Sequence, residues 1–80
     1  MEEEIEDQVG RLRIECKAIE KQIRGLLHHS FFDGAQLYVA QHNEMKAQIM
    51  LAVRHIEDTR MRLGKVRQYA GESNSIYDKL

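Results

Sequence analysis

Three residues in the second half of the chain are spaced so that they could bind a phosphate group. Arg60, Gly64 and Arg67 follow one another at intervals of four and three residues, so they share one face of a helix. Glycine inside a helix costs about 1 kcal/mol relative to alanine, and it leaves room for a close approach. Two guanidinium groups beside such a notch suit phosphates, which arginine binds bidentately. A second helix packing on Gly64 is the alternative interpretation.

Two more cations lie on the neighbouring faces of the same helix. Arg62 and Lys65 point away from the Gly64 face and could reach the notch of a neighbouring subunit. Spacing alone therefore gives Arg60, Gly64 and Arg67 as the phosphate-binding candidates, with Arg62 and Lys65 as contributors to a neighbouring subunit's notch. The earlier part of the same stripe contains Met50 and Val53, which favours a subunit interface there.

Other chemistry finds little support in the sequence. His28 and His29 are adjacent and cannot share a helix face, while His42 and His55 stand alone, so we predict no metal site. Cys16, the single cysteine, falls in an apolar column and is interpreted as a small hydrophobic residue. There is no glycine-rich phosphate loop and no nucleophile motif. We therefore expect a protein that is not an enzyme and needs no cofactor.

The elements that must position the notch are two amphipathic helices. Apolar residues in the first half recur at steps of four and three, which is a heptad pattern. The column consists of Ile5, Val9, Leu12, Cys16, Ile19, Ile23 and Leu26. A second such column follows with Met45, Ile49, Ala52, Ile56, Thr59, Leu63, Val66 and Ala70. The short connection predicts an all-α, antiparallel two-helix hairpin, coiled-coil-like, in a single domain over residues 1–80.

The predicted boundaries follow from the residues that start and stop helices. We expect helix 1 over about residues 4–28, a turn over 29–34, helix 2 over about 35–70 and a polar tail over 71–80. Asp33 is the predicted N-cap of helix 2, with Ser30 as the alternative. Gly71 is the predicted stop, because glycine commonly follows the last helical residue.

Length and composition restrict the class of protein further. Eighty residues in two helices make a thin, one-sided core, so we expect a homo-oligomer. No stretch approaches the roughly 20 apolar residues of a membrane span, and the start of the chain is acidic, unlike a signal peptide. We expect a cytoplasmic protein without a membrane partner. The net charge of −1 and the lack of a helix-turn-helix pattern argue against a nucleic-acid polymer as partner.

Residues 46–67 carry a resemblance to a known family. Their core, A-V-R-H-I-E-D-T-R-M-R-L-G-K-V, resembles the C-terminal helix of small phage proteins that share a helical hairpin. These are the cyclic-nucleotide sponges that counter the bacterial CBASS and Thoeris defence systems. The first helix is similar only in being a long amphipathic partner.

The resemblance implies both an assembly and a mechanism. Family members form hexamers of hairpins that hold cyclic oligonucleotides or cyclic ADP-ribose-type messengers between subunits. They sequester the messenger without cleaving it, in the cytoplasm of the bacterial host. The resemblance carries Arg60, Arg62, Gly64 and Arg67 over as candidate binding residues. The alternative is a coiled-coil adaptor or regulatory protein that binds another protein.

Overall fold

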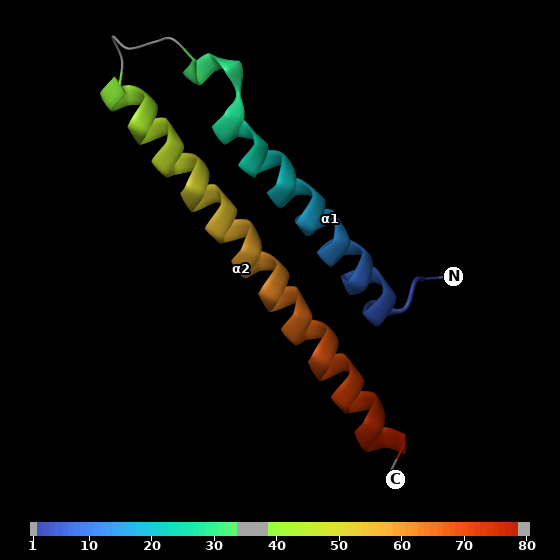
Figure 1. The fold of residues 1–80 in the computed structure, drawn as a ribbon. Coiled ribbons are helices and arrows are strands. Elements are labelled where there is room, and N and C mark those ends of the chain that lie inside the picture. Colours follow the sequence, from blue (N-terminus) through green and yellow to red (C-terminus); the bar gives the residue numbers. More distant parts are fainter. Residues whose placement is uncertain (1, 34–38, 79–80) are drawn as a thin grey trace.

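The chain folds into two long helices that lie side by side (Figure 1). The computed structural model describes residues 2–33 and 39–78, and the side chains of residues 2–33 and 40–72. Helix α1 spans Ile5–Gly25, and two short 3₁₀ turns follow, η1 over Leu26–His28 and η2 over Ser30–Phe32. Helix α2 spans Val39–Asp78 and packs along α1 in the opposite direction.

The predicted all-α hairpin is confirmed. No β-strand occurs in residues 2–33 or 39–78, and α1 and α2 pack against each other. The first turn of α1 contains Glu6 and Asp7, and the last contains Arg24, which matches the charge preference of the helix dipole. The pair forms a narrow rod with extents of 67 × 22 × 14 Å. Among residues 2–33 and 39–78, no helix is both long and apolar enough to cross a membrane.

The helix boundaries differ from the prediction at two ends. Helix α1 ends at Gly25 rather than near residue 28, because the backbone tightens into the 3₁₀ turn η1. Helix α2 continues through Gly71 to Asp78, so the predicted tail over 71–80 is wrong for residues 71–78. Gly71 lies on the helix, and the side chains of Gln68 and Glu72 hydrogen bond across it at 3.1 Å. A helical stop would have needed a different backbone conformation at that glycine.

The start of α2 lies partly outside the described residues. Residues 34–38 separate Asp33 from the first described turn at Val39, so the predicted N-cap cannot be compared. The alternative cap, Ser30, instead begins η2. There the side chain of His29 accepts a hydrogen bond from the backbone N–H of Phe31, at 2.9 Å.

The column of α2 that faces α1 is only partly the predicted one. Val53, outside the predicted column, is fully buried. Within the predicted column, Ile49, Ile56, Leu63 and Ala70 are half-buried, whereas Met45, Ala52, Thr59 and Val66 are exposed. On α1, Val9 and Cys16 are buried as predicted. Helix α2 is therefore turned so that the Val53–Arg60–Gly64 stripe meets α1. The physical reason lies at Gly64, where the missing side chain admits a residue of α1.

Candidate functional site

The notch at Gly64 is filled from within the chain. Arg13 of α1 lies across it, with its Cζ atom 3.3 Å from the position that a Cβ atom would take at residue 64. The Nε–H of Arg13 donates a hydrogen bond to the backbone carbonyl of Arg60, at 3.3 Å. The interpretation of Gly64 as a helix-packing glycine is therefore the one that the geometry shows. The contact also fixes one side of the Arg13 guanidinium against α2.

A groove opens next to this contact, between the two helices. It has a volume of about 390 Å³. Its lining is Gly10, Arg13, Ile14 and Lys17 from α1 and Arg60 and Arg67 from α2. Gly10 lies beside Arg67, where a Cβ atom would stand 3.8 Å from the Arg67 Cζ atom, an ordinary contact distance. We call this the cationic groove.

The charges in the cationic groove are all of one sign. Arg13, Lys17, Arg60 and Arg67 line it, and no acidic residue does. Within residues 2–33 and 40–72, none of these four side chains forms an ion pair. Four cations held close together repel one another, and an anion bound among them would relieve that repulsion. The arrangement of charges in the groove therefore favours an anion over a cation as a ligand.

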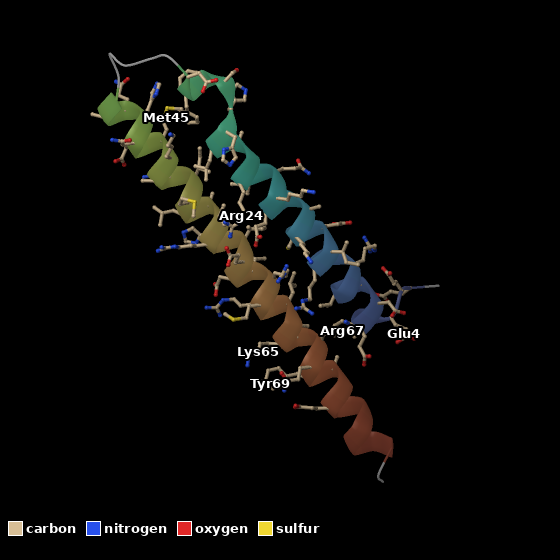
Figure 2. The ribbon with its side chains drawn as sticks, viewed as in Figure 1. Glu4, Arg24, Met45, Lys65, Arg67 and Tyr69 are labelled. Atoms are coloured by element: carbon tan, nitrogen blue, oxygen red, sulfur yellow. The ribbon has the colours of Figure 1, made fainter. Side chains whose placement is uncertain are left out.

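Exposure differs between the two sides of the groove. Arg13 and Arg60 are half-buried where the helices touch, while Lys17 and Arg67 are exposed at the rim. Figure 2 shows Arg67 reaching from α2 toward the start of α1, while Lys65 and Tyr69 project on the other side of α2. The two half-buried arginines thus form a fixed floor, and the rim offers cations that can adjust to a ligand.

Of the four predicted site residues, the structure brings three together. Arg60 and Arg67 line the groove, and Gly64 supports it by seating Arg13. Arg62 lies elsewhere, with a side chain that is 78% exposed and paired with Asp58 at 2.9 Å. Its hydrogen bond to Asp58 and the charge of that carboxylate raise the pKa of Arg62 above its ordinary value. Arg62 is therefore no part of the groove within one chain.

Four residues of the groove, Gly10, Arg13, Ile14 and Lys17, escaped the sequence analysis because they lie on the other helix. Gly10, Arg13 and Lys17 follow one another at intervals of three and four residues, so a glycine and two cations share one face of α1. That stripe runs beside the apolar column and carries no acid between Gly10 and Lys17 on the same face. Residues 60–67 of α2 also carry a glycine and two cations on one face. This similarity between the two helices could have predicted the groove, because antiparallel helices bring two such stripes together.

One of the histidines lies among aromatic rings at the turn end of the hairpin. No group of three or more potential metal ligands occurs among the described residues. His42 instead stacks near two aromatic rings, with its centroid 5.3 Å from that of Phe31 and 5.4 Å from that of Phe32. Lys46 places its Nζ atom 5.1 Å from the Phe32 centroid. These contacts hold the start of α2 against η2.

No family model, curated protein or solved structure matches this chain significantly. The function therefore has to be inferred from the residues of the cationic groove themselves and from the sequence of residues 46–67.

Proposed function

We propose that this protein is a phage-type sponge that binds cyclic nucleotide immune messengers and withholds them from their effectors. The ligand is a cyclic oligonucleotide or a cyclic ADP-ribose-type molecule, held without cleavage by a homo-oligomer of hairpins, a hexamer as in the family that residues 46–67 resemble. The protein acts in the cytoplasm of the bacterial host. Arg60 and Arg67, together with Arg13 and Lys17, contact the ligand's phosphates.

The observation that carries the proposal is the concentration of four cations, without an acid, in one groove. Cyclic dinucleotides, cyclic trinucleotides and cyclic ADP-ribose each carry at least two phosphate charges on a compact ring, and each arginine can offer two parallel N–H donors to a phosphate. A groove of about 390 Å³ falls within the usual size range of small-molecule sites. Ile14 supplies an apolar surface at the same place, against which a base or ribose can rest.

Ligand binding is tested by melting the intact chain with each candidate ligand. A ligand present at 100 times its Kd stabilises the folded protein by about 2.7 kcal/mol, so the melting temperature rises. The panel contains cyclic dinucleotides, a cyclic trinucleotide and cyclic ADP-ribose, with adenosine and inorganic phosphate as controls for the base and the charge alone. If no cyclic ligand raises the melting temperature beyond these controls, the proposal is wrong.

Sequestration without turnover needs a separate measurement. The protein is incubated with a ligand that binds, then heated to release it, and the ligand is analysed by chromatography. We expect the ligand to return intact, because no metal cluster or activated nucleophile lies among the described residues. If the amount of linear product increases with protein concentration and time, the protein is a cyclic-nucleotide hydrolase and the sponge proposal is wrong.

A coiled-coil adaptor is the second candidate, and one observation favours it. Large apolar side chains remain exposed along both helices, among them Ile19, Leu26 and Met45. An adaptor would use such a surface to bind another protein, and no nucleotide in the panel would change its melting temperature. The melting experiment therefore separates the two functions.

A further inference from the structure

One side of the hairpin carries an apolar face that α1 and α2 build together. On α1 and η1, Ile5, Leu12, Ile19 and Leu26 recur every seven residues, beside the buried column of Val9 and Cys16. All four remain half-buried or exposed, and Ile19 keeps 46% of its surface accessible. Helix α2 adds Ile49, Ile56 and Leu63, each half-buried, and the exposed Met45 and Val66. We call this set the apolar face.

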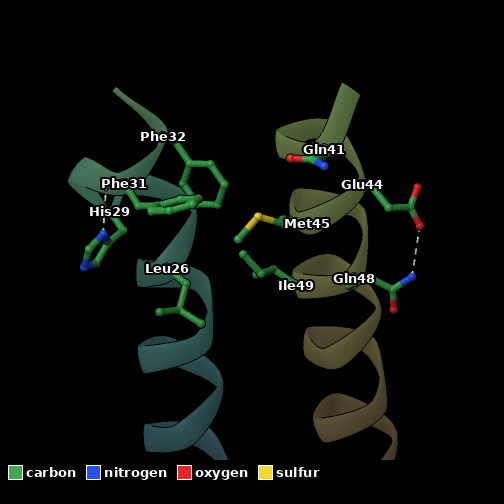
Figure 3. Close-up of a pocket in the computed structure, with 9 residues that line it drawn as sticks. All are labelled: Leu26, His29, Phe31, Phe32, Gln41, Glu44, Met45, Gln48 and Ile49. Atoms are coloured by element: carbon green, nitrogen blue, oxygen red, sulfur yellow. Dashed lines mark hydrogen bonds between the residues drawn. The ribbon is translucent and has the colours of Figure 1, made fainter. Parts of the chain in front are cut away.

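The two helices meet on this face in a groove near the turn. It has a volume of about 780 Å³, and Leu26, Phe31, Met45 and Ile49 are among its lining residues. Figure 3 shows Met45 and Ile49 directed from α2 toward the side of Leu26 and Phe31. Glu44 and Gln48 turn away from that gap and hydrogen bond to each other at 3.3 Å. The face is therefore apolar in its middle and polar along its edge.

The elongated hairpin exposes more surface than a compact globule of its mass. The chain exposes 6795 Å², whereas a compact globule of 9.4 kDa exposes about 5,000 Å². The difference of roughly 1,800 Å² exceeds the ~800 Å² that each partner contributes to a standard interface. Only Val9, Cys16 and Val53 are buried hydrophobic residues within the side chains described. Covering the apolar face would supply the missing core.

We infer that the apolar face is the contact between two copies of this chain, packed as a four-helix bundle. The inference deepens the self-association that belongs to the proposed function by naming the surface that forms it. A second hairpin is the occupant that fits, because it presents the same face with the same seven-residue repeat, and a two-fold axis makes such faces self-complementary. The cationic groove opens beside the other edge of the helix pair, where Ile14 and Lys17 lie.

Methionine oxidation tests the interface on the unaltered chain. Met45 lies on the apolar face and is 41% exposed, whereas Met61, 59% exposed, lies on the outer side of α2. Peroxide converts an accessible methionine to its sulfoxide. At a concentration where sedimentation shows assembly, we expect Met45 to be protected and Met61 to react freely. After dilution to the monomer, the two methionines should react at similar rates. A chain that stays monomeric at tens of micromolar, or a Met45 that reacts like Met61 in the assembly, would overturn the inference.

A matched pair of variants gives a second, independent reading. Ile19→Lys places a charge on the apolar face and should weaken association by about 100-fold, the effect of an interface hot spot. Ile14→Lys makes the same change at an isoleucine that is 73% exposed on the other side of α1, and should leave association unchanged. Equal effects in both variants would contradict the assignment of the face. No ligand enters either measurement, so the interface and the proposed ligand binding can fail separately.

Discussion

The two edges of the α1–α2 contact differ in composition although they share the same two helices. One edge carries Arg13, Lys17 and Arg67 around a groove without acids. The other carries Ile19, Leu26 and Met45, all large, apolar and exposed. A cationic edge attracts small anions, and an apolar edge attracts another apolar surface. We call the α1–α2 contact the seam. The proposed ligand-binding groove and the proposed assembly surface therefore lie on opposite sides of this seam.

The difference also shows how the helices are held together. Near the middle of α2 the contact with α1 is an apolar one, through the fully buried Val53. Toward the start of α1 it becomes a contact between glycines and arginine side chains, Gly64 with Arg13 and Gly10 with Arg67. Arginine stems cover apolar surface while their charged ends stay accessible. Stability should accordingly depend most on the middle of the seam, and ligand affinity most on the glycine–arginine end.

The largest expected effect is at the middle of the seam. Val53→Asp buries a charge with no partner at a position with no exposed surface, which costs on the order of 3–5 kcal/mol. An 80-residue hairpin with a thin core should lose its fold. Circular dichroism measures the helix content. Leu51→Asp, two residues away and exposed, is the control and should keep it. Native helicity in Val53→Asp would mean that the seam runs through another column.

The next effect concerns the two arginines that the sequence analysis treated alike. Arg67→Ala should weaken binding of a cyclic nucleotide by about 10- to 150-fold, because it removes a charge-assisted pair of hydrogen bonds. Arg62→Ala should leave affinity unchanged, since Arg62 lies outside the cationic groove and pairs with Asp58. Calorimetric titration measures both affinities, with Arg11→Ala on α1 as a further control. A loss in Arg62→Ala equal to that in Arg67→Ala would place the site between subunits.

The sequence predicted the elements well and their relative rotation poorly. The four–three spacing of apolar residues was sufficient for two helices in a hairpin, and for Val9 and Cys16 in the core. The column of α2 facing α1 could not be predicted in the same way, because the more apolar column is the half-exposed one. Hydrophobicity alone cannot tell an interface within a chain from one between copies. The contact of Arg13 with Gly64 is a steric feature of the observed rotation that hydrophobic spacing does not report.

The predicted site residues came from one helix only. Arg60, Gly64 and Arg67 were found because they lie on one helix, where spacing can be read directly. Arg13 and Lys17 belong to the other helix, and only the pairing of the two helices brings them to the groove. Arg62 was included because it lies within the segment of resemblance, although its own spacing puts it on a different face.

Alanine substitutions at three glycines should change the stability by smaller amounts that differ between positions. Gly64→Ala gains helix propensity of about 1 kcal/mol but presses on Arg13, whose Nη2 atom would lie 3.4 Å from the new Cβ atom. Gly10→Ala meets only the Arg67 guanidinium at an ordinary distance, and Gly25→Ala meets nothing within 4 Å. We therefore expect denaturant unfolding to show the smallest gain in stability for Gly64→Ala. Equal gains in stability at all three positions would show that the contact of Arg13 with Gly64 does not restrict the side chain at position 64.

The smallest expected effect belongs to the ion pair that joins the two helices directly within the described side chains, residues 2–33 and 40–72. Arg24 of α1 and Glu57 of α2 lie 2.8 Å apart between Nη2 and Oε1, and both side chains are 48% exposed. Solvent screens such a pair, so Glu57→Gln should reduce the free energy of unfolding by at most about 1 kcal/mol. High salt should reduce the difference between variant and parent, because the Debye length falls from about 10 Å at 0.1 M to about 3 Å at 1 M. Urea unfolding at low and high salt measures the change, and Glu44→Gln, on α2 but in contact with Gln48 rather than with α1, is the matched control. A loss well above 1 kcal/mol that persists in high salt would mean that Glu57 is buried by a neighbouring copy, and that the cationic side of the seam takes part in assembly as well.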